Sequence, residues 1–270
     1  MKRVLIGLAV ISTASLSFAN ELLLKKEGLS TYVQEEEFMV AEGENVIGPV
    51  FLLPIAKLQG LAIQGKDLKI KSYIIEGDNK NWKDALKGQV VSVEGEGRFL
   101  RGEVVNINDN RIMLNTRKGF VVTTLPKFPS KLSSSLKWQE LFSPKVTFKV
   151  TAKEAKTEKF LLRYPVQGIN WQVNYVLKKE NGKATLEGFI RLINNTPLSL
   201  RNVNVKLLEK GKVVKELPET VLPAFSKKEI LFLEDTYPPK SQKLLPDGSV
   251  AIYENGFFKG FKMLKDGKIR

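Results

Sequence analysis

The sequence predicts an all-β protein in which a small SH3-like or Sm-like barrel is followed by an antiparallel β-sandwich. Short apolar runs recur along residues 20–270, and Gly, Asn, Asp or Pro separate them, as is typical of strands joined by turns. No run keeps a helical period of apolar residues over three turns. Hydrophobic residues make up 43% of the chain, which is enough to build a packed core.

The first nineteen residues have the parts of a secretory signal. Lys2 and Arg3 form a basic start, residues 4–11 are apolar, and Ser17-Phe18-Ala19 is a small-x-small cleavage site. The apolar run is shorter than the roughly 20 residues that a spanning helix needs. We therefore expect residues 1–19 to be a signal peptide and the mature protein, which starts at Asn20, to be exported to the periplasm or cell envelope without a transmembrane segment.

The chain contains no His and no Cys. Their absence excludes a Ser-His-Asp triad, a Cys nucleophile, a disulfide, and metal sites built on imidazole or thiolate. Carboxylates, Lys, Tyr and activated Ser remain as catalytic groups. We expect no cofactor, no metal and no enzymatic activity.

The protein is basic. It has 43 Lys and Arg residues against 29 Asp and Glu residues, a formal net charge of +14, and loss of Lys2 and Arg3 with the signal lowers this charge to +12. A basic surface attracts the polyanion that shares its compartment, so export favours an anionic envelope polymer over nucleic acid. The alternative is that the Lys-rich faces are only solvated.

The predicted elements follow in order along the mature chain. Residues 20–83 form an N-terminal β region, with apolar strands at 31–38, 50–53, 61–64 and 68–75. Residues 84–130 form the small barrel, because strands at 88–93, 99–107, 111–116 and 119–125 are joined by tight turns. Residues 131–144 are rich in Ser, Lys and Pro and are predicted to be a linker.

Residues 145–236 show the clearest alternation. Val146, Phe148 and Val150 share one side of a predicted strand, and a later strand places four large apolar side chains, from Trp171 to Leu177, on one face. Several such strands must cover one another's apolar faces, which predicts the β-sandwich. Residues 237–270 follow as a C-terminal hairpin and tail, with the hairpin at 250–263.

The most distinctive local pattern is Tyr164-x-x-x-Gly168-x-x-Trp171-x-x-x-Tyr175. Gly168 allows a turn with positive φ, and Trp171 and Tyr175 point to the same side of a strand. The residues themselves favour a structural role in a shared core. The functional alternative is a sugar-stacking platform, which requires an exposed Trp171.

This pattern resembles the signature of the mucoidy inhibitor A-like family, the domain of unknown function 4139. The resemblance covers about residues 145–263. It extends to Asn195-Thr196, in a turn before a strand, and to Pro246, Gly248 and Tyr253. It implies an exported, β-rich protein with no assigned catalytic activity. Pro197 departs from the family pattern, and the long coiled-coil insertion and further C-terminal strands of larger members are missing.

These observations predict a non-enzymatic envelope protein that acts as a protein-interaction or structural module. A first alternative is a binder of anionic glycan or lipid headgroups that uses lysines such as Lys206, Lys227 and Lys228. A second alternative is a glycan hydrolase that works with a carboxylate pair. Its candidate residues are Glu94, Glu96, Glu103 and Glu187.

Overall fold

The computed structural model describes residues 20–78, 81–95, 97–238 and 245–270. The predicted signal peptide, residues 1–19, lies outside this part of the chain. Most of the described residues lie in strands and few lie in helices, which confirms the predicted all-β fold class. None of the helices in these ranges has the length and apolar character that crossing a bilayer requires.

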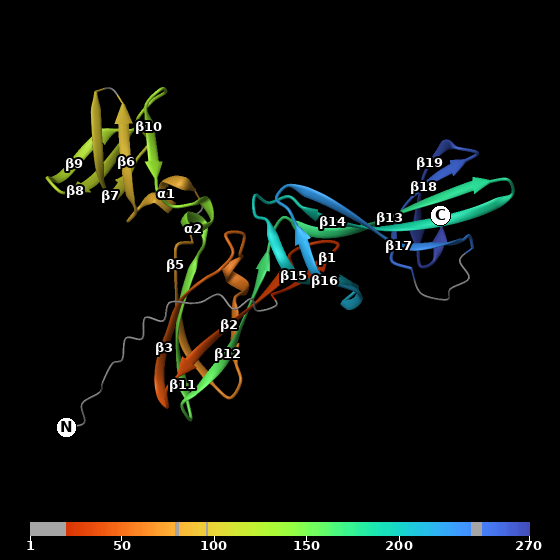
Figure 1. Cartoon of the computed structure of the whole chain (residues 1–270), viewed down its shortest axis with the longest axis horizontal. Helices are drawn as coiled ribbons and strands as arrows, with labels where there is room; N and C mark the ends of the chain where they lie inside the picture. Colours follow the sequence, from red (N-terminus) through yellow and green to blue (C-terminus); the bar gives the residue numbers. More distant parts are fainter. Residues whose placement is uncertain (1–19, 79–80, 96, 239–244) are drawn as a thin grey trace.

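The elements are labelled in Figure 1. The strands before the barrel are β1 (Glu21–Lys25), β2 (Ser30–Val40), β3 (Gly43–Phe51), β4 (Ala62–Gly65) and β5 (Lys69–Glu76). The segment predicted as a barrel, a name kept below for this unit, contains β6 (Val90–Gly95), β7 (Arg98–Ile107), β8 (Arg111–Thr116), β9 (Gly119–Thr124) and β10 (Lys131–Ser134). In the described residues these strands form one open sheet with β10 and β9 at its edges. The next strands are β11 (Lys145–Ala152), β12 (Lys156–Val166), β13 (Ile169–Glu180), β14 (Lys183–Asn194) and β15 (Leu200–Glu209). The last strands are β16 (Lys212–Leu222), β17 (Ser226–Thr236), β18 (Gly248–Glu254), β19 (Phe257–Lys265) and β20 (Lys268–Ile269). The short helices are η1 (Leu58–Gly60), α1 (Trp82–Leu86) and α2 (Trp138–Phe142).

In the described chain these strands form four sheets. Sheet 1 has the order β16-β15-β1-β2-β12-β4, and sheet 2 has the order β17-β14-β13-β18-β19-β20. Sheet 3 consists of β3-β11-β5, and the barrel sheet has the order β10-β6-β7-β8-β9. Sheets 1, 2 and 3 share one continuous apolar core and together form the body of the protein.

The N-terminal strands belong to this body and do not form a region of their own. Strand β1 lies between β15, with which it is parallel, and β2, with which it is antiparallel. Leu22 and Leu24 of β1 are fully buried. Their burial requires partners on both sides, and the alternating pattern of a strand does not reveal that these partners lie far along the sequence.

Two long strands connect the two ends of the body. Strands β2 and β12 pair along their whole length, from Lys156↔Val40 to Val166↔Ser30. At one end, Phe160 of β12 contacts Phe148 of sheet 3, with ring centroids 5.2 Å apart. At the other end, Tyr164 contacts Tyr32, with ring centroids 5.7 Å apart. Ser30, at that end of β2, donates a hydrogen bond to the carbonyl of Ile169 in sheet 2 at 2.8 Å, so the same pair of strands contacts both sheet 3 and sheet 2.

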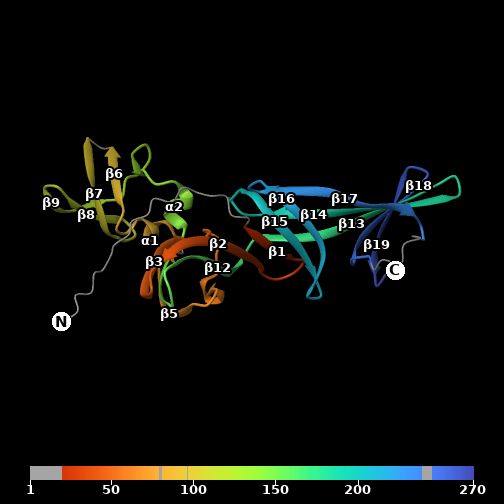
Figure 2. The same ribbon diagram turned by 60° about the horizontal axis from the view of Figure 1, so that its bottom comes forward.

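The barrel is inserted between two paired strands of the body. The chain leaves β5 at Glu76 and re-enters β11 at Lys145, and these two residues are partners in the β5–β11 ladder. Between them, the barrel has a separate apolar core formed by Leu86, Val91, Val93, Val104, Ile107, Ile112 and Leu114. Figures 1 and 2 show the barrel as a distinct body at one end of an elongated molecule.

The residues predicted as a linker, 131–144, contain regular structure. Strand β10 pairs with β6 and adds a fifth strand to the barrel sheet. Leu132 packs against the barrel core, as does Leu141 of α2. The many Ser and Lys residues of this segment give no alternating apolar pattern, so the strand could not be recognised in the sequence. A four-residue edge strand needs only one apolar side chain that points inward.

The C-terminal hairpin, β18 and β19, lies at the end of the molecule opposite the barrel (Figure 1). It joins sheet 2 through a parallel pairing of β18 with β13, from Asn174↔Ser249 to Lys179↔Glu254. Val250 and Leu264 anchor it in the core of the body, where both are fully buried.

Candidate functional surfaces

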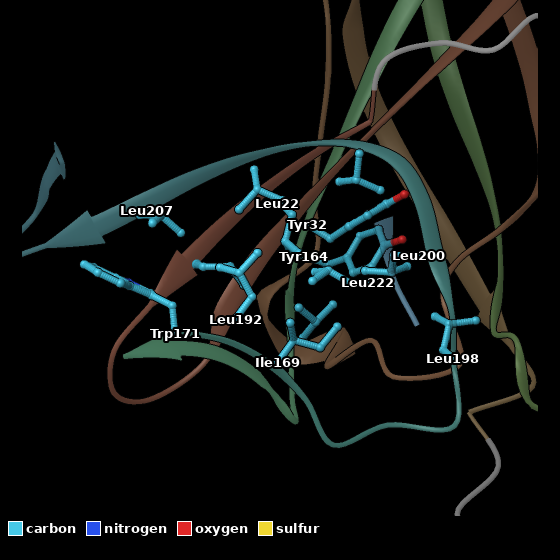
Figure 3. Packing of buried hydrophobic residues seen from close by; sticks show 14 of the residues in the cluster. Leu22, Tyr32, Tyr164, Ile169, Trp171, Leu192, Leu198, Leu200, Leu207 and Leu222 are labelled. Atoms are coloured by element: carbon cyan, nitrogen blue, oxygen red, sulfur yellow. The ribbon is translucent and has the colours of Figure 1, made fainter. Parts of the chain in front are cut away.

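The signature aromatic residues lie inside the body. Tyr164 and Trp171 are 0% exposed and Tyr175 is 1% exposed. Figure 3 shows Tyr164 beside Tyr32, and Trp171 beside Leu207, among leucines of sheets 1 and 2. A sugar-stacking platform at Trp171 requires an exposed ring, so that alternative is wrong.

Tyr164 joins two elements of the body through its hydroxyl group. The hydroxyl donates a hydrogen bond to Gln34 Oε1 at 2.8 Å and accepts one from the backbone N–H of Leu53 at 3.2 Å. Burial raises the pKa of the Tyr164 phenol well above its ordinary value. The neutral phenol is therefore a fixed part of the fold.

The turn between β12 and β13 packs against the turn between β14 and β15. Gly168 has φ of +84°, and a Cβ atom at this position would lie 2.8 Å from Thr196 Cγ2. The Gly168 carbonyl accepts a hydrogen bond from the N–H of Asn195 at 2.8 Å. The side chain of Asn195 itself is exposed.

Asn194, which the sequence analysis missed, is the polar centre of this region. It is fully buried, and its amide group donates to the carbonyls of Leu198 and Pro223, each at 2.8 Å. Its Oδ1 atom accepts from the N–H and hydroxyl of Thr196 at 3.0 and 2.6 Å. Alternation along β14 could have indicated that Asn194 is buried, because it follows the buried Leu192 by two residues and so points to the same side.

A polar network surrounds the Trp171 ring. The indole N–H donates to the carbonyl of Leu208 at 3.2 Å, and Lys26 Nζ lies 4.9 Å from the ring centroid. Lys26 also pairs with Glu209 and donates to the Asp247 carbonyl at 2.5 Å. The network ties the chain after β1 and the turn after β15 to the segment before β18.

Tyr175 and Gly248 fix that same segment. The Tyr175 hydroxyl donates to the Pro246 carbonyl at 2.8 Å. A Cβ atom at Gly248 would lie 2.5 Å from the carbonyl oxygen of Val173, so only glycine fits there without a shift. Burial raises the Tyr175 pKa, and the negative charges of Glu209 and Asp247 raise it further.

The predicted carboxylates do not come together in one site. Glu94 pairs with Lys131 at 3.1 Å, and Glu187 pairs with Lys178 at 2.5 Å in a different sheet. Glu103 lies on the outer face of the barrel sheet, and Glu96 is outside the described residues. Within the described ranges, no group of three or more acidic side chains is placed to hold a metal ion.

The predicted lysines are also separated. Lys206 lies in sheet 1, where it pairs with Glu21 at 2.6 Å. Lys227 and Lys228 are adjacent in β17 of sheet 2, so their side chains point to opposite faces. These three residues do not form one anion-binding surface.

The outer side of the barrel sheet exposes four large apolar residues, which we call the barrel face. It consists of Val90, Phe99, Phe120 and Val122, whose exposed fractions are 49, 66, 60 and 47%. The strand register places them on the side opposite the barrel core, because Val90 and Asn115 pair with Glu103, and Asn115 pairs with Phe120. Glu103 and Asn115 lie between Val90 and Phe120 in this register, so the exposed apolar side chains are interleaved with polar ones.

A hollow of about 690 Å³ adjoins the barrel face. Val90 and Phe99 line it together with Arg101, Arg117 and Lys118, while Glu103 is its acidic residue. The hollow therefore combines apolar walls with an excess of positive charge. A second hollow, of about 640 Å³, is lined by residues of the two connections between barrel and body, including Glu76, Lys87, Glu140 and Lys145.

The family resemblance stays a prediction after comparison with known proteins. No family model, no curated protein and no solved structure matches this chain.

Proposed function

We propose that this chain is an exported, non-enzymatic protein of the cell envelope that acts as an interaction module, and that the barrel face binds a protein partner. The barrel face is the observation that carries the proposal. Its phenylalanines are exposed, although the barrel already buries a core of its own. Apolar side chains exposed in this way are typical of protein interaction sites.

The distribution of polar atoms supports a non-enzymatic role. The hydroxyl groups of Tyr164 and Tyr175 and the amide of Asn194 are engaged in hydrogen bonds within the fold. Glu94 and Glu187 are engaged in ion pairs with lysines of neighbouring strands. These groups stabilise the body and the barrel, which leaves surfaces as the means of action.

The hollow beside the barrel face indicates the chemistry of the partner. Arg101, Arg117 and Lys118 line it together with Phe99. A partner segment with apolar side chains and an acidic residue would match both properties. Because apolar contact dominates such an interface, we expect binding to persist as salt is raised.

The test places a photoreactive amino acid at position 99 or 120 in the native cell envelope, with position 213 of β16 as the exposed control. We expect a discrete protein adduct from the barrel positions and none from position 213. Pull-down from detergent-solubilised envelope, in which no bilayer remains, should lose the complex across a salt series in the Phe99→Ser/Phe120→Ser variant and retain it in wild type. Absence of a protein adduct from both barrel positions would contradict the proposal.

A further inference from the structure

The C-terminal hairpin has an exposed aromatic face, which we call the hairpin face. It includes Phe258, Phe261 and Met263, with exposed fractions of 51, 72 and 52%, and the less exposed Tyr253. The ring centroids of Tyr253 and Phe258 are 5.6 Å apart, and those of Phe258 and Phe261 are 5.0 Å apart. The rings therefore form one continuous apolar surface.

A bulge explains why Phe258 and Phe261, three residues apart, share this face. The register shifts between Ile252 and Tyr253, so β19 carries one extra residue at that point. Beyond the bulge, Phe261 pairs with Ala251 and Met263 pairs with Ser249. The buried Val250 and Leu264 alternate with these positions and point to the opposite side, into the core.

Three cations continue the same face. Lys265 and Lys268 are direct partners in the β19–β20 ladder, and Lys265 lies two residues from Met263. Arg270 exchanges two backbone hydrogen bonds with Met263, at 3.1 and 2.9 Å, so it is directly opposite that residue. By alternation all three cations lie on the side of Phe261 and Met263. Like charges opposite each other destabilise a ladder unless an anion lies nearby.

The neighbouring acidic residues are directed elsewhere. Glu254, at the hairpin turn, pairs with Lys259 at 3.8 Å. Asp266, in the turn between β19 and β20, lies 3.5 Å from Lys210 of the body. The hairpin face thus combines exposed aromatic side chains with a group of cations.

We propose that the hairpin face binds the surface of an anionic lipid bilayer. Aromatic side chains enter the interfacial layer, and lysines and arginines beside them interact with anionic headgroups. Phe257 supports a bilayer over a protein partner, because it is 72% exposed and its pairing with Glu254 places it on the side opposite Phe258. The interfacial layer of a bilayer accepts aromatic side chains on both sides of one turn.

The position of the hairpin permits this contact. It lies at the end of the elongated molecule, far from the barrel (Figure 1). The proposal does not depend on the barrel face, because the two surfaces share no residues and lie at opposite ends. An envelope-bound protein could use the hairpin to hold the barrel away from the membrane.

The test measures flotation of residues 20–270, which include every described element, with vesicles of phosphatidylcholine mixed with phosphatidylglycerol and with vesicles of phosphatidylcholine alone. We expect binding to the anionic vesicles that weakens as salt shortens the Debye length. Lys265→Gln/Lys268→Gln should weaken this binding about 30-fold, because each cation near an anionic surface strengthens binding about five-fold. Phe258→Ser/Phe261→Ser should abolish the part of the vesicle binding that persists at high salt.

Matched variants separate this proposal from the proposed function. Phe99→Ser/Phe120→Ser removes two exposed phenylalanines from the barrel, and Lys212→Gln/Lys215→Gln removes two exposed lysines from β16. Both controls should bind the vesicles as wild type does, and Phe258→Ser/Phe261→Ser should keep the adducts formed at positions 99 and 120. Thermal melting checks that each variant is folded.

A direct readout places a tryptophan in the hairpin face. Phe261→Trp should show a blue-shifted emission, and quenching by brominated lipid, only with anionic vesicles. The proposal is overturned if anionic vesicles do not bind at low salt, or if the hairpin variants bind as well as wild type. It is equally overturned if a photoreactive residue at position 261 forms adducts with a protein and none with lipid.

Discussion

At the scale of single residues, the most informative side chain is Asn194. Its amide and carbonyl groups join the end of β14 to the turn that follows and to the segment after β16. Its neighbour Asn195 has an exposed side chain, although its backbone N–H meets Gly168. Two adjacent asparagines thus have opposite roles, which makes them a natural experimental pair.

Asn194→Ala should lower the free energy of unfolding by about 3 kcal/mol, because it leaves buried carbonyl groups and the Thr196 hydroxyl without partners. Asn195→Ala should change it by less than about 0.5 kcal/mol, as exposed substitutions usually do. Urea unfolding followed by circular dichroism measures both. Equal effects of the two substitutions would show that Asn194 is not the polar centre of the turn.

Tyr175 predicts a loss of stability at alkaline pH. Because its pKa is raised in the folded state, the stabilisation is fully present below the ordinary phenol pKa of about 10 and is lost as the pH rises beyond it. Each such tyrosine lowers the free energy of unfolding by about 1.4 kcal/mol per pH unit in that range. Tyr32 and Tyr164 contribute in the same direction.

Above pH about 10, the free energy of unfolding of Tyr175→Phe should therefore fall less steeply with pH than that of wild type. The difference in slope should be about 1.4 kcal/mol per pH unit, which corresponds to one proton. At neutral pH the same variant should lose about 1 kcal/mol, because its hydrogen bond to the Pro246 carbonyl is removed. Urea unfolding at a series of alkaline pH values gives the slope. An unchanged slope would mean that the Tyr175 phenol ionises equally in the folded and unfolded states.

At the scale of elements, the turn between β12 and β13 determines how the body closes. Gly168→Ala should destabilise the protein by about 2 to 3 kcal/mol, because a Cβ atom is strained at positive φ and also meets Thr196. Gly182→Ala, in the turn between β13 and β14, has the same backbone strain at φ +73° but no atom within 4 Å of the new Cβ. It should cost about 1 kcal/mol.

Chemical unfolding of the two glycine variants separates the contact from the strain. The difference between their losses of unfolding free energy measures the contribution of the contact between Gly168 and Thr196. If both variants lose the same stability, the close approach of Gly168 and Thr196 contributes nothing beyond the backbone conformation.

The sequence predicted elements better than their partners. Alternation at Val146, Phe148 and Val150 identified β11 because burial on one face leaves a period of two in the sequence. The parallel pairings of β1 with β15 and of β13 with β18 leave no such local signal, since a pattern specifies a face and not a neighbour. Strand β10 was missed because its side chains are mainly polar.

For the candidate surfaces, too, the sequence predicted which residues are buried better than which faces stay exposed. The signature aromatic residues of the β12–β13 segment are buried, as a structural interpretation requires, because large aromatic residues at strand spacing favour a core. The apolar barrel and hairpin faces were not predicted. Exposure depends on which side of a sheet is covered, and at Phe258 and Phe261 a bulge decides it.

At the scale of the whole molecule, two apolar cores predict two units of unfolding. The barrel core and the body core share no residues, and the connections lie side by side at the partners Glu76 and Lys145. Replacing residues 77–144 by a short Gly-containing turn should leave a folded body, and residues 81–142 should fold alone. Calorimetry of the whole chain should show two transitions, each matching one part.

Loss of structure in the body after removal of the barrel would contradict this division. The same experiment tests the role of the hollow between barrel and body, because the shortened chain lacks most of the residues that line it. A body that melts as in the whole chain shows that these contacts contribute little to its stability.

The central position of β1 has a consequence for synthesis of the chain. Glu21 is opposite Asn204, so β1 cannot be enclosed until β15 has been made. Strand β2 similarly cannot pair with β12 until β12 has been made. All strands of the barrel, in contrast, come from one continuous stretch of sequence. We therefore expect the barrel to fold first, from one continuous stretch of chain, and the body to condense in a single later event once its last third has emerged.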